Sequence, residues 1–460
     1  MENIWEKFKQ NEQINSLLTG FRAGVKIQYL SGSLLSLQRM VMAYLRRETG
    51  SPVLYIVENQ LQATKVREDL ATFLPQDKIV IFPPLEVLPY EVIARSWESR
   101  SQRLSVLNGL IKGEDLVVIA PIQALLTKLV PAEMIKKMSF ALKVGACVEL
   151  EQIINDLLNL GYERVEMVEA PGQFSVRGGI IDIYSLVFPL PIRLELFDNE
   201  VDSIREFDPF SQRSLTSLTE YLVFPAEEGV FSPVSEEKAK QLIRQDLNRA
   251  MDKLSKSRRK SARDKLKNKI EDVLRQIEEG LYFPTLESYL SYYGDLVSLA
   301  DYFPENSLVW VEEPLRVREA MLNWQREVAE THLNLLKEGM ALPKQIERYF
   351  MEDNLSWFFQ SKPAILSSFL TQSVPNLTIN NYVNLTSQPV ISFYGKLDDL
   401  LWRELSLWKE RQYKILIIAS TEERANRLAE LCRERNIFPI LAEEISLPIP
   451  DGSVLIAIGS

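Results

Sequence analysis

Apolar runs alternate with amphipathic helical patterns from the N-terminus to about residue 125, and this alternation constrains the fold more than any other feature of the sequence. The apolar runs end at glycine or proline, as at Gly32, Pro83 and Pro121. Such runs are typical of parallel strands that helices bury on both faces. We therefore expect an α/β domain with a doubly wound parallel sheet. Its strands are predicted at 26–32, 52–58, 78–83 and 115–121, and its helices at 35–49 and 61–74.

The pattern changes to a series of short strands between about residues 140 and 225. Turn signals such as Gly178-Gly179 and Asp198-Asn199 separate these strands. We expect a small, mainly antiparallel module at 131–225 that divides the first domain into residues 1–130 and 226–349. The predicted strands of the module are 163–169, 172–185, 191–198, 200–208 and 221–225.

A helical pattern follows the module from Ser235 to Gly280, and it fits either one long helix or two. A buried strand then ends at Glu312 and Glu313, which returns the chain to the α/β style. We assign residues 350–460 to a further α/β domain. Its expected strands are 363–368, 414–420 and 453–459, with an amphipathic helix at 421–436.

Histidine and cysteine are too scarce for several kinds of chemistry. His332 is the single histidine, and the two cysteines, Cys147 and Cys432, lie far apart. These numbers exclude a thiolate and imidazole zinc cluster and a disulfide framework, and any histidine-dependent triad would have to use His332. We interpret His332, which lies in a polar helical run, as a solvated or capping residue. With no signal peptide and no long apolar stretch, we expect a cytoplasmic protein without membrane contact or a metal site.

The first strand-to-helix turn, at Gly32 and Ser33, is where a doubly wound domain would bind a phosphate. A P-loop needs further glycines and a lysine followed by a hydroxyl residue, but Gly32 is the only glycine of this turn and no lysine lies between Ser31 and Arg39. Glu312 and Glu313 could supply the acidic partner site, yet without the lysine we interpret them as a solvated turn. We expect a degenerate nucleotide site without catalytic residues or cofactor. Weak nucleotide binding through backbone groups stays open.

Several segments together resemble the bacterial transcription-repair coupling factor family, whose N-terminal region is similar to the excision-repair protein UvrB. The most specific match is LGYERVEMVEAPGQFSVRGGIIDIYS from Leu160, continued by PIRLELFDNEVDSIREFDPFSQRSL from Pro191. Shorter matches are FPPLEVLPYE from Phe82, SRSQRLSVLNGL from Ser99, VVIAPIQALL from Val117 and DYFPENSLVWVEEP from Asp301. The resemblance covers about residues 1–350 well, and residues 350–460 only by position and α/β style.

The resemblance implies a degenerate, helicase-like UvrB-like domain, split by a module that recruits the damage-recognition protein UvrA. The chain would be the non-catalytic N-terminal part that brings UvrA to stalled RNA polymerase in transcription-coupled nucleotide excision repair. RNA polymerase, duplex DNA, ATP and Mg would bind to parts that follow residue 460 in the family, where an ATP-dependent translocase motor lies. The segment with which UvrB inserts a hairpin into damaged DNA has no obvious room between Phe82 and Ala120. The alternative function is a nucleotide-dependent, DNA-binding enzyme related to helicases.

The resemblance places the UvrA contacts on Arg177, Arg193 and Phe197. Residues at alternate positions of a strand share a face, so Arg193 and Phe197 are expected on one side of their strand together with Glu195. An arginine beside an exposed aromatic ring is typical of a binding hot spot. The alternative is that the arginines pair with local carboxylates, Glu195 or Asp182, and that Phe197 is a core residue.

A basic run is the other charged feature, in a chain whose net charge of −10 argues against coating nucleic acid by bulk charge. Its cations are Lys253, Lys256, Arg258, Arg259, Lys260, Arg263, Lys265, Lys267 and Lys269, with Asp264 as the only acid among them. A helix this basic could contact DNA phosphates weakly and in a salt-sensitive way. It lacks aromatic residues for stacking on bases, and a charge run is usually a solvated helix face. Docking on an acidic surface elsewhere in a larger protein is a further alternative.

Overall fold

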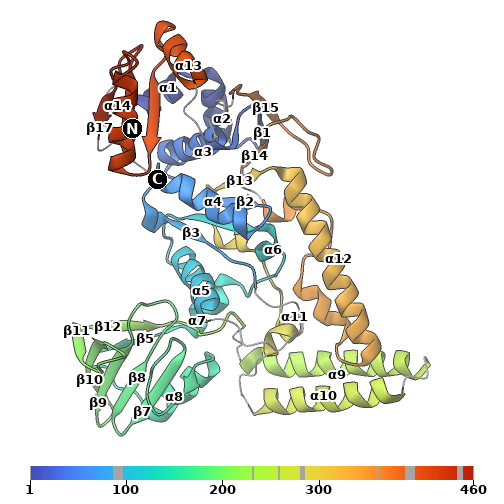
Figure 1. The fold of residues 1–460 in the computed structure, drawn as a ribbon. Coiled ribbons are helices and arrows are strands. Elements are labelled where there is room, and N and C mark those ends of the chain that lie inside the picture. The colour runs from blue at the N-terminus through green and yellow to red at the C-terminus, as the bar shows by residue number, and fades with distance from the viewer. Residues whose placement is uncertain are drawn as a thin grey trace.

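The computed structural model describes residues 2–85, 97–229, 233–256, 260–279, 285–359, 362–388, 399–442 and 449–458. These residues form a parallel-sheet domain, a β module, a helical hairpin and a small C-terminal domain (Figure 1). Residues 86–91 of the segment that begins at Phe82, and Arg258 and Arg259 of the basic run, lie outside the described residues.

The parallel-sheet domain contains seven strands in the order β15-β1-β14-β13-β2-β4-β3, and every pairing between them is parallel. This confirms the expected α/β parallel sheet. The strands are β1 (Ile27–Ser31), β2 (Val53–Val57), β3 (Ile79–Ile81), β4 (Val117–Pro121), β13 (Leu308–Glu312), β14 (Ala364–Ser367) and β15 (Asn381–Asn384).

The position of β14 corrects the domain boundary expected at residue 350. This strand lies between β1 and β13, in the interior of the seven-stranded sheet, and β15 forms the sheet edge beside β1. Residues 362–388 are therefore part of the first domain, and the separate C-terminal domain begins after them. A short apolar strand carries no local information about which sheet it joins, because its partners are distant in sequence: β1 precedes β14 by more than 300 residues, and β13 precedes it by more than 50.

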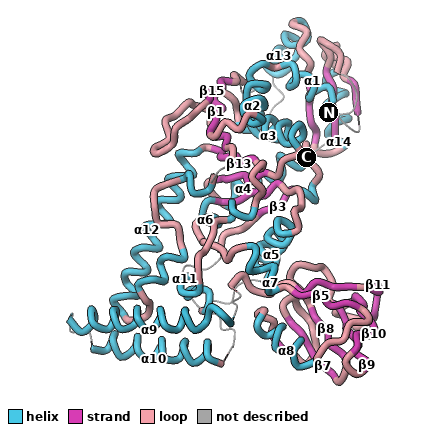
Figure 2. The backbone as a smooth tube through the Cα atoms, turned by 180° about the vertical axis from the view of Figure 1, so that it is seen from behind, coloured by secondary structure: helices cyan, strands magenta, loops and turns pink. Residues whose placement is uncertain are grey.

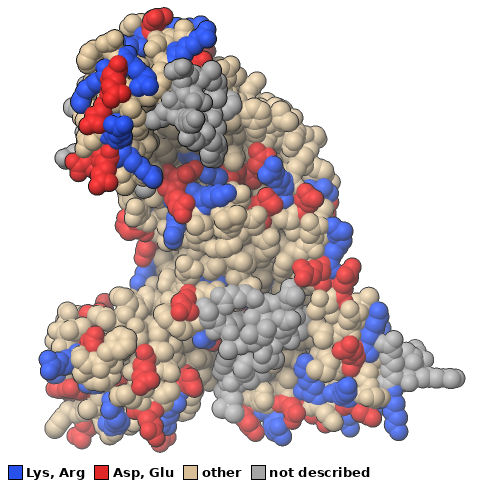
Figure 3. Space-filling model, in the orientation of Figure 1, with Lys and Arg blue, Asp and Glu red and all other residues tan. Residues whose placement is uncertain are grey.

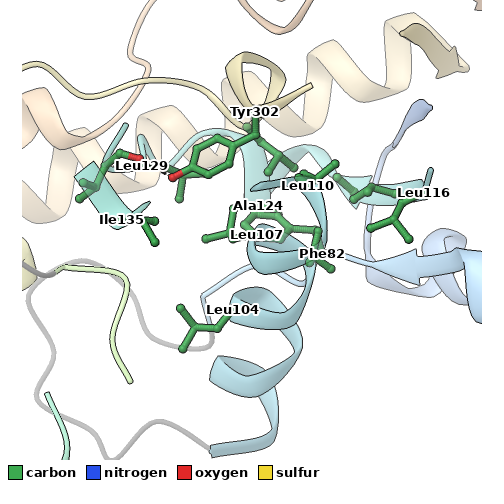
Figure 4. Close-up of a cluster of buried hydrophobic side chains, with 14 of the residues drawn as sticks. Phe82, Leu104, Leu107, Leu110, Leu116, Ala124, Leu129, Ile135 and Tyr302 are labelled. Atoms are coloured by element: carbon green, nitrogen blue, oxygen red, sulfur yellow. Dashed lines mark hydrogen bonds between the residues drawn. The ribbon is translucent and has the colours of Figure 1, made fainter. Parts of the chain in front are cut away.

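Helices cover both faces of the seven-stranded sheet, because side chains alternate along each strand. In β2, Tyr55 faces a core shared with four N-terminal helices, whereas Leu54 and Ile56 face a core shared with α5, α6 and α12. Figure 4 shows part of the second core, where Leu107 of α5 lies close to Phe82 and Leu104 lies further along the same helix. The helices are α1 (Glu2–Gln10), α2 (Glu12–Arg22), α3 (Leu35–Thr49), α4 (Gln60–Ala71), α5 (Trp97–Ile111), α6 (Ile122–Leu125) and α12 (Pro314–Glu338).

The β module is a six-stranded sheet in the order β11-β10-β9-β8-β7-β6, and all of its pairings are antiparallel except that of β6 with β7. The expected mainly antiparallel module is thus observed. Its core is continuous with the second core of the parallel-sheet domain. The elements are α7 (Ala132–Met138), β5 (Phe140–Lys143), α8 (Leu150–Asn159), β6 (Glu163–Arg164), β7 (Gln173–Arg177), β8 (Ile180–Ile183), β9 (Ile192–Phe197), β10 (Glu200–Phe207), β11 (Ser214–Leu218) and β12 (Glu220–Val223).

Strand β11 was not expected from the sequence. Four of its five residues are exposed, so the alternation of apolar and polar residues that reveals a half-buried strand is missing. The pair β5 and β12 forms a separate two-stranded antiparallel sheet beside the module.

The helical segment after the module consists of two helices, α9 (Pro233–Lys256) and α10 (Lys260–Glu278), that pack against each other through a core of their own. Short elements at the base of this hairpin are η2 (Leu286–Tyr289), α11 (Leu290–Tyr293) and η4 (Pro343–Arg348). Seen from behind, α12 extends from the parallel-sheet domain to the hairpin (Figure 2). His332 lies buried on α12, so its interpretation as a solvated or capping residue was wrong.

The C-terminal domain has a parallel three-stranded sheet in the order β16-β18-β17 and a core of its own. Its elements are α13 (Asp399–Glu410), β16 (Ile415–Ala419), α14 (Glu422–Arg433), β17 (Ile440–Ala442) and β18 (Val454–Ile458). None of the helices in the described part of the chain is both long and apolar enough to cross a membrane.

Candidate functional site

The outer face of the six-stranded sheet carries the residues singled out from the sequence. Strand β9 pairs with β8 so that Arg193 stands opposite Asp182, and β7 pairs with β8 so that Arg177 stands opposite Ile180. The alternate residues of these strands face the core, among them Ile181 and Leu194. Arg177, Asp182, Arg193 and Phe197 therefore lie on the same outer side of the sheet.

Asp182 organises this face. It is fully buried, and its carboxylate accepts a hydrogen bond from Nη2 of Arg177 at 2.8 Å. The same carboxylate accepts two hydrogen bonds from Arg193, from Nε at 2.7 Å and from Nη2 at 2.8 Å. A buried carboxylate with three charge-assisted hydrogen bonds holds both guanidinium groups in fixed positions.

The two arginines differ in how much surface they offer. The Arg193 side chain is only 17% exposed, because its guanidinium lies 4.6 Å from the ring centre of Phe207 and donates to Gln212 Oε1 at 3.0 Å. Hydrogen bonding to Asp182 raises the pKa of Arg193, against the opposing effect of burial. The Arg177 side chain is 50% exposed and is held by Asp182 on one side.

Phe197 is 75% exposed at the end of β9, so the alternative that it is a core residue was wrong. The other part of that alternative, local pairing of the arginines, does occur through Asp182, whereas Glu195 pairs with Arg205 at 3.4 Å. Phe210 is also strongly exposed, in the loop between β10 and β11. Our sequence analysis missed Phe210, although an aromatic residue after Asp-Pro in a predicted turn is a signal that could have marked it.

The turn at Gly32, where a nucleotide phosphate would bind, is covered by other parts of the chain. Gly32 has a φ of 83°, and its N–H donates to the carbonyl of Phe369 at 2.9 Å. A Cβ at this position would lie 2.1 Å from Oδ1 of Asn384, which shows how closely the chain packs there. Ser33 is fully buried, and the Gly32 carbonyl accepts from the N–H of Ser387 at 3.1 Å. Both backbone groups of Gly32 are thus used within the protein.

Glu312, at the end of β13, is buried and not part of a solvated turn as we expected. Its carboxylate accepts hydrogen bonds from Arg39 Nε at 3.0 Å, from Arg39 Nη2 at 2.8 Å and from the Tyr55 hydroxyl at 2.6 Å. Arg39 comes from α3 and also pairs with Asp69 at 2.5 Å. Burial would lower the pKa of Arg39, but its bonds to Glu312 outweigh this effect and raise it.

Glu313 follows in a left-handed backbone conformation with a φ of 51°, and its carboxylate accepts from the N–H of Phe369 at 3.3 Å. Both glutamates are thus engaged by neighbouring parts of the chain. Among the described residues, no group of three or more histidine, cysteine or carboxylate side chains is placed to hold a metal ion.

Comparison with known proteins gives the following similarities. Residues 140–228 match the family model of the UvrB interaction domain. The chain is 34% identical over 444 residues to a Bacillus subtilis protein described as a transcription-repair-coupling factor; the match covers 95% of this chain and 37% of the relative. Relatives of the same description from Staphylococcus aureus strains MRSA252 and USA300 are 27% identical over 428 residues, which is 92% of this chain and 35% of each relative. The chain spans little more than a third of the length of these relatives.

Proposed function

We propose a function from two similarities. Residues 140–228 match the UvrB interaction domain family, and nearly the whole chain is homologous to part of the transcription-repair-coupling factors. On this proposal the chain takes part in transcription-coupled nucleotide excision repair as a recruitment unit, which brings UvrA to stalled RNA polymerase. The outer face of the six-stranded sheet is the surface that UvrA binds. RNA polymerase, duplex DNA and ATP would be handled by other parts of a full-length protein.

The observation that carries the proposal is an exposed phenylalanine beside two arginines that a buried carboxylate fixes. Phe197 has no place in the core, and its exposure costs solvation free energy that a partner pocket would recover. Arg177 and Arg193 are already held by Asp182, so binding would immobilise little additional side-chain freedom. Preorganised arginine next to a rigid aromatic anchor is the composition of an interface hot spot.

The region around Gly32 supports a non-catalytic role for this chain. Arg39 and Tyr55 bind Glu312 in the position where an ATPase would present a carboxylate for metal-nucleotide, and Asn384 packs on the turn that would cradle phosphates. We infer that this domain has the shape of an ATPase without its chemistry. Titration calorimetry with Mg-ATP tests this inference against the alternative of a nucleotide-dependent, helicase-like enzyme. Binding of Mg-ATP with a micromolar dissociation constant would contradict this inference and favour the helicase-like enzyme.

The test of UvrA capture is a binding measurement between immobilised UvrA and the chain. Phe197→Ala, Arg177→Ala and Arg193→Glu should each weaken binding by about 2 kcal/mol or more, which is about thirtyfold. Phe197→Ala is the sharpest variant, because the exposed ring supports nothing in the core. Lys143→Ala, on the exposed face of the separate two-stranded sheet, is the matched control and should bind UvrA normally. If all three site variants retain wild-type affinity, the assignment is wrong.

A further inference from the structure

Charge is segregated along the helical hairpin formed by α9 and α10. At one end, where α9 begins and α10 finishes, three basic residues form ion pairs: Lys240 with Glu237 at 2.9 Å, Arg244 with Glu278 at 3.0 Å and Arg275 with Asp272 at 2.8 Å. At the other end, where α9 finishes and α10 begins, positive charge predominates. We call this second region the basic end, and its described cations are Arg249, Lys253, Lys260, Arg263, Lys265 and Lys267.

The cations of the basic end are exposed and largely uncompensated. Lys267 pairs loosely with Glu271 at 3.7 Å, whereas the other five cations form no ion pair with any residue in the described part of the chain. Within the described part of α9 and α10, Asp252 and Asp264 are the only acids of this end, and neither forms an ion pair with a described residue. The exposed Glu338 lies at the end of α12, where Gly339 packs against Ala262. Figure 3 shows blue side chains over this end of the hairpin, at the lower right. So many like charges in a chain of net charge −10 repel one another and attract a polyanion.

The composition of the basic end indicates which polyanion it fits. No large hydrophobic side chain is exposed on the described residues of α9 or α10, so the surface lacks the apolar anchor that a protein partner would need. No aromatic residue occurs between Arg249 and Lys269, so single-stranded bases would find no stacking platform. What remains is charge alone on two rigid helices, which suits the phosphate backbone of a duplex, where charge is dense and regular.

The hairpin is also held firmly enough to present these charges. On α9, Asp246 accepts from the Tyr292 hydroxyl at 2.5 Å and from the N–H of Lys344 at 3.0 Å. On α10, Nζ of Lys269 donates to the carbonyl of Met340 at 2.6 Å, just beyond the end of α12. Lys269 is thereby removed from the exposed set. The cations of the basic end follow Asp246 on α9 and precede Lys269 on α10, so these contacts hold both helices next to them.

We propose that the basic end of the α9–α10 hairpin binds the phosphate backbone of duplex DNA without sequence preference. This contact is separate from the outer face of the six-stranded sheet and does not depend on the UvrA proposal. If about four phosphates are neutralised, the logarithm of the affinity falls with the logarithm of salt concentration with a slope of about −3.6.

The test measures fluorescence anisotropy of a short labelled duplex of arbitrary sequence, titrated with the full chain over a series of salt concentrations. The variant is Lys260→Glu/Arg263→Glu/Lys267→Glu, whose positions share one face of α10 because they are three and four residues apart. It should lower the affinity at low salt more than tenfold and reduce the slope by about 2.7. A milder Lys260→Gln/Arg263→Gln/Lys267→Gln variant gives the same slope change with less repulsion, and circular dichroism checks that both fold.

The matched control is Lys240→Glu/Arg244→Glu/Arg275→Glu, which makes the same change in net charge at the other end of the hairpin. It should leave duplex affinity within about threefold, since charges more than a Debye length from the DNA are screened. Equal losses in the two triple variants would show that only net charge matters and would overturn the proposal. Absence of duplex binding by the wild-type chain at low salt would overturn it as well. Tighter binding of polyglutamate than of duplex would reassign the surface to an acidic protein.

Discussion

Replacing Arg39 by methionine should destabilise the parallel-sheet domain severely, because it strands a buried carboxylate. The side chains of Arg39 and Glu312 are only 6% and 5% exposed, and two hydrogen bonds of 2.8 and 3.0 Å join them. Removing one partner of a buried ion pair costs about 3–5 kcal/mol. Glu312 would keep its hydrogen bond from Tyr55 at 2.6 Å, so we expect the lower value, about 3 kcal/mol. Arg39→Met/Glu312→Leu should recover all but about 1 kcal/mol, left by the Tyr55 hydroxyl that loses its acceptor.

The measurement is urea unfolding followed by near-ultraviolet circular dichroism, in which the stacked pair Tyr55 and Trp310 reports on this site. With an m value of about 1–3 kcal/mol/M, a loss of about 3 kcal/mol lowers the midpoint by about 1 M or more. Arg67→Met, an exposed position on α4, is the control and should leave the midpoint unchanged. A single Arg39→Met variant within 1 kcal/mol of wild type, or a double variant no more stable than the single one, would refute the buried-pair reasoning.

Two further predictions concern other buried groups. Arg103→Met should lower the free energy of unfolding by about 3–5 kcal/mol, because Arg103 is fully buried and donates to Glu228 Oε2 at 2.9 Å and to the Pro83 carbonyl at 2.6 Å. The variant should also expose the junction between α5 and the end of the β module to proteolysis. Arg164→Met, at an exposed position, is the control, and an unchanged digestion pattern of Arg103→Met would contradict the prediction. Burial lowers the pKa of His332, so the folded state binds a proton on this side chain less readily than the unfolded chain, which is protonated near pH 6.5. The folded state therefore loses stability as the pH falls below that value. His332→Gln should show a shallower loss between about pH 7 and 5 in thermal unfolding, and parallel curves would exclude this role.

Local signals predicted the elements well, because the residues that begin and end them are adjacent in sequence. The helix predicted at 35–49 has the observed bounds of α3, since Gly50 adopts the left-handed conformation that ends it. Partners distant in sequence could not be predicted in this way. Glu312 was taken for a solvated residue because Arg39, which neutralises it, lies 273 residues earlier in the chain. His332 was misjudged for a related reason: its helix looks polar, but the base of the hairpin covers the face on which it lies.

Two surfaces of this chain carry positive charge, and their neighbours distinguish the partners they can bind. On the β module, Arg177 and Arg193 stand beside the exposed ring of Phe197, so recognition there combines charge with an apolar anchor, as in protein interfaces. On the hairpin, the described residues of α9 and α10 expose no large hydrophobic side chain beside the cations, so recognition there depends on charge and must weaken with salt. Because the two surfaces share no residues, their variants should act independently. Phe197→Ala should leave duplex binding and its salt slope unchanged, and the α10 triple variant should leave UvrA binding unchanged.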